Sequence, residues 1–374
     1  MRSQVAWLSL KKEHAGSVRS QEMETPSHIS PRSGLTATYE AEPRLASNTS
    51  PPLPQAPTVV GLVLLASAAS LAGWLPLQLS VATLFLLAGP HNWMEFRYFV
   101  ARMPVRWGAS RDFFLIAIAG VTGLTLIYAA LPMLASAWLW SDADWSTSAA
   151  VWNSLLILWI ILLIHMRGRE LPGRDWSLAM PIGFALVAVN WIVPQIWEIG
   201  LVYLHPLVAL WFLDRQLRRS RPEWIPAYRR CLACLPIVLA LLWLRLAHAG
   251  PLPSDNGLAL RITQHAGAGI LRGVSSHLLV ATHVFLETIH YSIWIVILPI
   301  IGLRSAPWRT GGIPLVRHRL GWPRAVRTAL AIGAFGVLLL WISFLADYSA
   351  TRDLYFTVAM LHVLAEAPFL LRMI

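Results

Sequence analysis

Charged residues are scarce in this chain, and their scarcity excludes most classes of soluble protein. They make up 13% of the 374 residues, whereas apolar residues make up 56% and the mean hydropathy is +0.56. Soluble globular chains contain about 25% charged and about 45–50% apolar residues. The composition therefore predicts that most of the chain lies in a lipid bilayer, which is its expected partner.

Cysteine is also rare, and its placement excludes a redox role. The two cysteines, Cys231 and Cys234, form a CxxC pair at the start of an apolar stretch. A redox CxxC needs a soluble, thioredoxin-like setting, which this sequence lacks. We interpret both residues as small apolar side chains on a helix.

Several motifs of other protein classes are missing. There is no HExxH sequence, which argues against an intramembrane zinc protease, and no GxSxG or P-loop in a usable setting. The net charge of +11 comes from arginines in short loops, not from a basic domain with interleaved aromatic residues. We therefore expect no nucleic-acid partner. No apolar segment follows a short charged start, so we expect no cleavable signal peptide.

The chain divides into a polar start and an apolar remainder. Residues 1–57 are rich in Ser, Pro and mixed charge, and we predict a disordered cytoplasmic tail. Residues 58–374 are predicted to form an all-α, polytopic transmembrane bundle of about ten spans, at roughly 20 residues per span. The expected spans are about 58–75, 77–99, 112–133, 147–166, 176–193, 194–213, 229–248, 276–302, 325–346 and 354–373.

Arginines fall in alternate loops of this arrangement. They concentrate in 100–111, 167–175, 214–228 and 303–324, whereas the other loops contain only Arg261, Arg272 and Arg352. Loops rich in Lys and Arg stay in the cytoplasm. The pattern predicts an integral membrane protein, of a bacterial inner membrane, with both termini cytoplasmic.

Three His-x-x-x-Glu pairs lie inside the predicted spans. A charged residue in the centre of a membrane helix costs about 2.5–3.5 kcal/mol, so a repeated pairing indicates a shared function. Residues four apart lie on the same face of a helix. The pairs are His91/Glu95, His283/Glu287 and His362/Glu366.

Further ionisable residues extend the pattern. His290 follows His283 by two helical turns, and Glu198 and His205 have the same spacing in another span. The spans that carry all these residues run in the same direction, from outside to inside. His91, His205, Glu287, His290 and Glu366 then lie at similar depth, about 15–22 Å from the outer end at 1.5 Å per residue. The topology therefore favours one shared polar site.

Imidazole and carboxylate together are ligands for iron, zinc or manganese, and helical bundles assemble such sites from facing helices. We predict a membrane-embedded, metal-dependent enzyme that acts on a lipid-soluble small molecule. Iron and oxidation are favoured over zinc and hydrolysis. The expected catalytic residues, which bind metal, orient imidazoles or move protons, are Glu95, Glu287 and Glu366. The expected metal ligands are His91, His205, His283, His290 and His362.

Other interpretations use the same residues. A proton- or ion-coupled transporter would use them as a relay, and a structural role would use them for hydrogen bonds between helices. Haem would need two histidines from different helices, but has no need of three buried carboxylates. The remaining histidines beside loops, His248, His265, His277 and His318, are expected to be solvated.

The segment Gly89-Pro90-His91, followed by His283 and His290 in later spans, resembles the bacterial membrane β-carotene 15,15′-dioxygenase family. The resemblance implies a polytopic fold, an iron ion held by histidines of several helices, and a hydrophobic polyene substrate that enters from lipid. It implies iron ligation by His91, His205, His283 and His362.

Overall fold

The computed structural model describes residues 55–253, 257–302 and 309–373, and this part of the chain is built from helices without a strand. The prediction of an all-α bundle is confirmed. The predicted tail, 1–57, lies almost entirely outside the described residues, and the first helix begins at Gln55, before the expected boundary.

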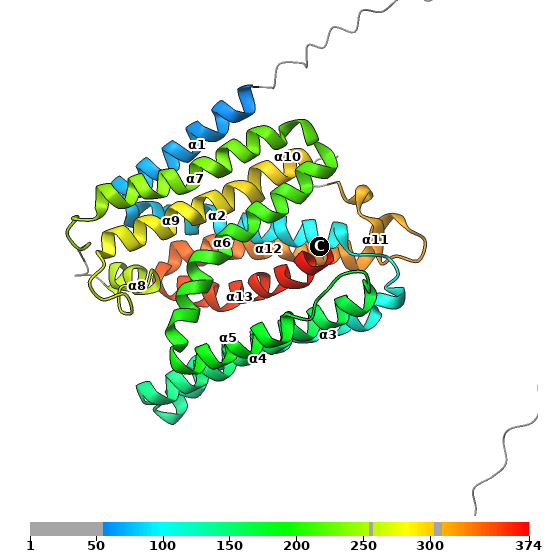
Figure 1. The fold of residues 1–374 in the computed structure, drawn as a ribbon, viewed down its shortest axis with the longest axis horizontal. Helices are drawn as coiled ribbons and strands as arrows, with labels where there is room; N and C mark the ends of the chain where they lie inside the picture. The colour runs from blue at the N-terminus through cyan, green and yellow to red at the C-terminus, as the bar shows by residue number, and fades with distance from the viewer. Residues whose placement is uncertain (1–54, 254–256, 303–308, 374) are drawn as a thin grey trace, which may run out of the picture. The chain divides into compact units, whose positions relative to one another are not determined.

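Each predicted span corresponds to a helix (Figure 1). The long helices are α1 (Gln55–Trp74), α2 (Pro76–Arg102), α3 (Arg111–Trp138), α4 (Asp142–Glu170), α5 (Ala179–Ile192), α6 (Pro194–Ser220), α7 (Ile225–Leu246), α9 (Ser276–Ser292), α12 (Pro323–Ala346) and α13 (Tyr348–Met373). The short helices are α8 (Gly257–His265), α10 (Leu298–Gly302) and α11 (Pro314–Arg317).

Eight helical segments of the described part are long and apolar enough to cross a membrane. Two of the ten predicted spans are not among them. The helix α5 is apolar but has only 14 residues, because it ends at Ile192, just before Pro194 begins α6. The helix α2 has 27 residues, but its second half contains His91, Asn92, Glu95 and Arg97, which lower its hydropathy.

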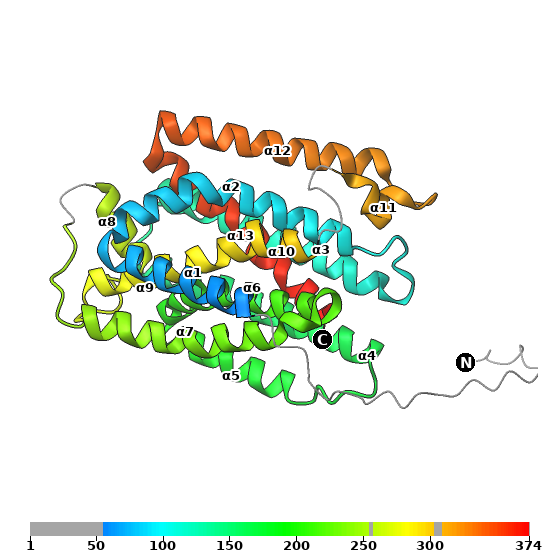
Figure 2. The same ribbon diagram turned by 90° about the horizontal axis from the view of Figure 1, so that it is seen from above.

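Four helices surround the centre of the bundle. The helix α2 contacts α9 and α13, and α6 contacts the same two helices, so the four form a closed ring. Figures 1 and 2 show that α2, α9 and α13 begin at the end of the bundle where α8 lies. The remaining long helices pack outside this ring, with α12 against α2, α1 and α7 against α9, and α3 and α4 against α13.

The apolar core on one side of the ring is largely aromatic. Phe99 of α2 stacks on Phe369 of α13 at a ring-centroid distance of 4.3 Å, and Trp294 packs edge-on against Tyr98 at 5.5 Å. Phe212 of α6 completes this cluster. These large buried rings fix the spacing of the helices that carry the polar residues.

Candidate metal centre

The four helices of the ring bring six of the predicted site residues together. His91 and Glu95 come from α2, His205 from α6, His290 from α9, and His362 and Glu366 from α13. Each pair four residues apart occupies one helix face, and the ring turns both of these faces inward.

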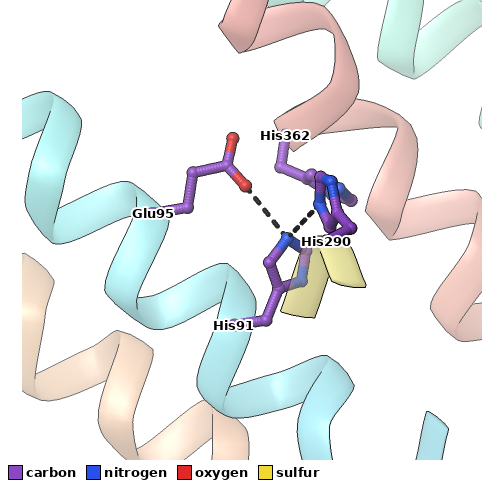
Figure 3. Close-up of side chains that lie close together, drawn as sticks. All are labelled: His91, Glu95, His290 and His362. Carbon is purple, nitrogen blue, oxygen red and sulfur yellow. Dashed lines mark hydrogen bonds and ion pairs between the residues drawn. The ribbon is translucent and has the colours of Figure 1, made fainter. Parts of the chain in front are cut away.

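Four of these residues form the inner group, His91, Glu95, His290 and His362 (Figure 3). One donor atom from each lies within 4.8 Å of the others. The Nε2 atoms of His91 and His290 are 2.9 Å apart, and His91 Nε2 is 3.1 Å from Glu95 Oε2. The His362 ring meets the His91 ring edge-on, at a centroid distance of 4.9 Å.

His205 and Glu366 lie beside the inner group. The Nδ1 atom of His205 is 3.0 Å from Oε2 of Glu366, and His290 joins these two residues in a second set of close donor atoms. The His205 ring lies 4.7 Å from the His290 ring and 5.3 Å from the His362 ring. The six side chains are therefore one contiguous cluster.

The centre is deeply buried. The exposed fraction is 0% for His91 and Glu95 and 2% for His290 and Glu366. Oε1 of Glu95, Oε1 of Glu366, and Nδ1 of His91 and of His362 have no hydrogen-bond partner there. The other oxygen of each carboxylate contacts only an imidazole. A buried carboxylate is costly unless a cation compensates its charge.

The orientation of His290 suits ligation. Its Nδ1 atom lies 3.2 Å from the carbonyl oxygen of Pro206, the residue after His205. A carbonyl can only accept, so Nδ1 carries the hydrogen and Nε2 presents its lone pair to the centre. A histidine that binds a metal almost always donates its other ring N–H to a carboxylate, a backbone carbonyl or a water.

All four helices depart from regular α-helix near the centre. Interior prolines occur at Pro90, Pro206 and Pro368, each within two residues of a cluster residue. The helix α9 runs into a π-helical turn at Ile293–Ile297, soon after His290. Prolines release a backbone carbonyl, and π-helical turns occur frequently at functional sites. Pro206 and Pro368, beside His205 and Glu366, are the sequence signals for these irregularities in α6 and α13.

The other predicted site residues lie elsewhere. His283 and Glu287 of α9 belong to neither set of close donor atoms. Glu287 accepts a 2.6 Å hydrogen bond from the Tyr291 hydroxyl, and the His283 ring lies 5.1 Å from that of His265. Glu198 of α6 is also outside both sets. Of the eight predicted site residues, the structure thus brings six into the cluster and places two, His283 and Glu287, outside it.

Three polar residues next to the cluster were not predicted. The Tyr291 ring lies 4.8 Å from the His91 ring, and Asn92 Nδ2 donates to the Tyr355 hydroxyl at 3.4 Å. Tyr291 and Asn92 each directly follow a cluster histidine in the chain, which was the available signal. Tyr355 lies two turns before His362, and no sequence signal marked it as a site residue.

No protein-family model matches the chain, and neither a curated protein nor a solved structure is significantly similar to it.

Proposed function

We propose that this protein is a membrane-embedded enzyme whose six clustered residues bind a divalent metal ion. The observation that supports it most is the convergence of imidazoles and carboxylates from four helices, where four of the six residues are buried and His205 and His362 are half-buried. In this proposal His91, Glu95, His290 and His362 bind the ion directly. His205 and Glu366 complete the coordination or orient the inner ligands.

Imidazole nitrogens and carboxylate oxygens make up the donor set of the cluster. The donor atoms of His91, Glu95, His290 and His362 lie within 4.8 Å of one another. Histidines with a carboxylate and open positions are typical of non-haem iron oxygenases. We therefore favour iron over zinc, and oxidation over hydrolysis.

An apolar groove supports a lipid-soluble substrate. It has a volume of about 600 Å³ and lies between α2, α8, α12 and α13, with Phe85, Ile262 and Phe344 among its lining residues. Phe85 packs against the hydrophobic cluster that includes Tyr291 and Tyr355, beside His91. At 1.5 Å per residue, Phe85 at the inner end of the groove lies about 9 Å along α2 from His91. A polyene, which the family resemblance implies, is a lipid-soluble substrate.

The proposed location is a bacterial inner membrane with both termini in the cytoplasm. Arginines lie in the last turns of α2, α4 and α6, at the ends of these helices opposite to α8; they are Arg102, Arg167, Arg169, Arg218 and Arg219. The positive-inside rule would place that end in the cytoplasm.

Metal analysis of the purified full-length protein tests the proposal. We expect about one iron ion per chain after reconstitution with ferrous iron, and loss of binding in His290→Ala. The control is His277→Ala, because His277 of the same helix contacts the carbonyl oxygen of Gly73 and no cluster residue. Absence of stoichiometric metal in the folded wild-type protein would contradict the proposal.

A further inference from the structure

A second row of polar side chains leads from the candidate metal centre towards the α8 end of the bundle. His283, Glu287 and Tyr291 follow one another at intervals of one turn along α9. Their exposed fractions are 7%, 8% and 4%, so all three are buried. These residues lie beside the centre but belong to neither set of close donor atoms, so we looked for a role of their own.

The inner end of the row reaches the edge of the centre. The Tyr291 hydroxyl donates to Glu287 at 2.6 Å, and its ring lies 4.8 Å from the His91 ring. The side chains of Tyr291 and Tyr355 belong to the same buried cluster. Tyr355 accepts a hydrogen bond from Asn92, in the helical turn between His91 and Glu95. Polar side chains therefore extend from Glu287 to the turn that carries two cluster residues.

The outer end of the row reaches His265, the last residue of α8. The His265 ring lies 5.1 Å from the His283 ring and stacks on Phe356 at 4.3 Å. His265 was expected to be solvated, but it is half-buried, because it packs between α9 and α13. It thus contacts the buried row on one side and solvent on the other.

Tyr203 of α6 holds this outer contact in place. Its hydroxyl lies 2.8 Å from the carbonyl oxygen of Ala266 and 3.1 Å from that of Leu279. One of these contacts is with the residue after His265 and the other is with α9. The Tyr203 hydroxyl therefore links the end of α8 to α9 and is not itself part of the row.

Burial and the neighbouring groups disfavour a trapped proton on His265. The groups that face His283 are Glu287 on its own helix, His265 from α8 and Arg352 from α13. The pKa of His265 lies well below its ordinary value because burial disfavours the imidazolium, as do His283 and Arg352. His265 is therefore neutral at pH 7, and a proton that it receives is readily passed on.

We propose that His265, His283, Glu287, Tyr291 and Tyr355 carry protons between the solvent at the α8 end and the candidate metal centre. An imidazole accepts a proton on one ring nitrogen and releases one from the other. At each step one N–H or O–H bond breaks as the next forms, so one proton moves and no electron is transferred. A tyrosine hydroxyl passes on its own proton as it receives another and remains neutral. The proposal rests on the proposed metal centre, whose protonation the row would serve.

A pH jump on the cobalt-loaded, full-length protein tests the proposal. Co²⁺ bound by histidine and carboxylate absorbs visible light, so its spectrum reports protonation at the centre. The protein in detergent is mixed rapidly from pH 8 to pH 6, and the spectral change is followed with time. A positioned acid–base group contributes about 10²–10⁴-fold to a rate. We expect Glu287→Gln and His283→Ala to slow the spectral change at least about tenfold. Their spectra at equilibrium should equal those of the wild type.

Two controls distinguish a loss of proton transfer from a disturbance of the protein structure. His277→Ala removes a histidine near the start of α9, outside the row, and should leave the rate unchanged. Added imidazole should restore the rate in His283→Ala but not in Glu287→Gln. Unchanged rates in both variants with bound cobalt, or a cobalt spectrum that does not respond to pH, would overturn the proton path. Absence of any cobalt spectrum in the wild type would overturn the proposed metal centre itself.

Discussion

The Nδ1 atom of His205 lies 3.0 Å from Oε2 of Glu366, and this contact joins α6 to α13 beside the buried cluster. The side chain of Glu366 is 2% exposed and that of His205 is 16% exposed. The pair therefore lies between the inner group and the more open side of the ring, where it can orient both helices. Partners of this kind support the residues that bind a metal.

Replacement of this carboxylate should weaken metal binding. We expect Glu366→Gln to lower iron affinity by about 10–100-fold, the usual effect of losing a residue that supports a metal site. Titration of the apoprotein with ferrous iron measures the affinity. The control is Asp353→Asn on the same helix, because the side chain of Asp353 is 50% exposed at the helix start. Equal affinities of Glu366→Gln and the wild type would contradict this role.

Metal removal should lower thermal stability. A ligand that binds only the folded state at 100 times its Kd stabilises that state by about 2.7 kcal/mol. We expect a chelator to lower the Tm of the wild-type protein in detergent, and iron to restore it. In Glu95→Ala/His290→Ala, which lacks two inner ligands, the Tm should respond to neither. A wild-type Tm independent of iron and chelator would argue against the ion.

A side chain at Gly89 should push α2 away from α12. A Cβ atom there would lie 3.0 Å from Val337 Cγ1 and 3.3 Å from Leu340 Cδ2. We expect Gly89→Leu to destabilise the protein by about 1–3 kcal/mol, as overpacking does. The matched control is Gly336→Leu on α12, where a Cβ meets no atom within 4 Å. Unfolding in mixed micelles of increasing denaturing detergent compares the two, and equal stabilities would contradict close packing at Gly89.

The short helix α5 should depend on a buried amide pair. Asn153 Nδ2 donates to Asn190 Oδ1 at 2.9 Å, and Asn190 Nδ2 donates to the Ala150 carbonyl oxygen at 2.7 Å. Hydrogen bonds between membrane helices contribute about 0.6 kcal/mol on average and up to about 1.7 kcal/mol. We expect Asn190→Leu to cost an amount in this range in the same unfolding assay.

A double variant identifies the cause of that loss. Asn153→Leu/Asn190→Leu leaves no unpaired side-chain amide, so it should recover part of the stability lost in Asn190→Leu. A double variant whose loss equals the sum of the two single losses would show that the pair does not interact.

Much of the architecture followed from local properties of the sequence. The ten apolar stretches predicted ten helices, since each stretch is long enough to require internal hydrogen bonds in a membrane. The spacing of His91 and Glu95 predicted their contact, which is 3.1 Å within one helix. The helix α8 was not predicted, because its nine residues lie in a segment rich in Gly and Pro, which is the composition of a loop.

The sequence by itself determined which residues share a helix face, because i and i+4 positions are neighbours in any α-helix. Only the tertiary structure decided which faces meet. Glu366 contacts His205 of another helix, and the His283 ring lies beside His265. His290 turns its Nε2 towards His91. The rotation and displacement of each helix depend on how side chains interlock with those of its neighbours, and this information is spread over the whole chain.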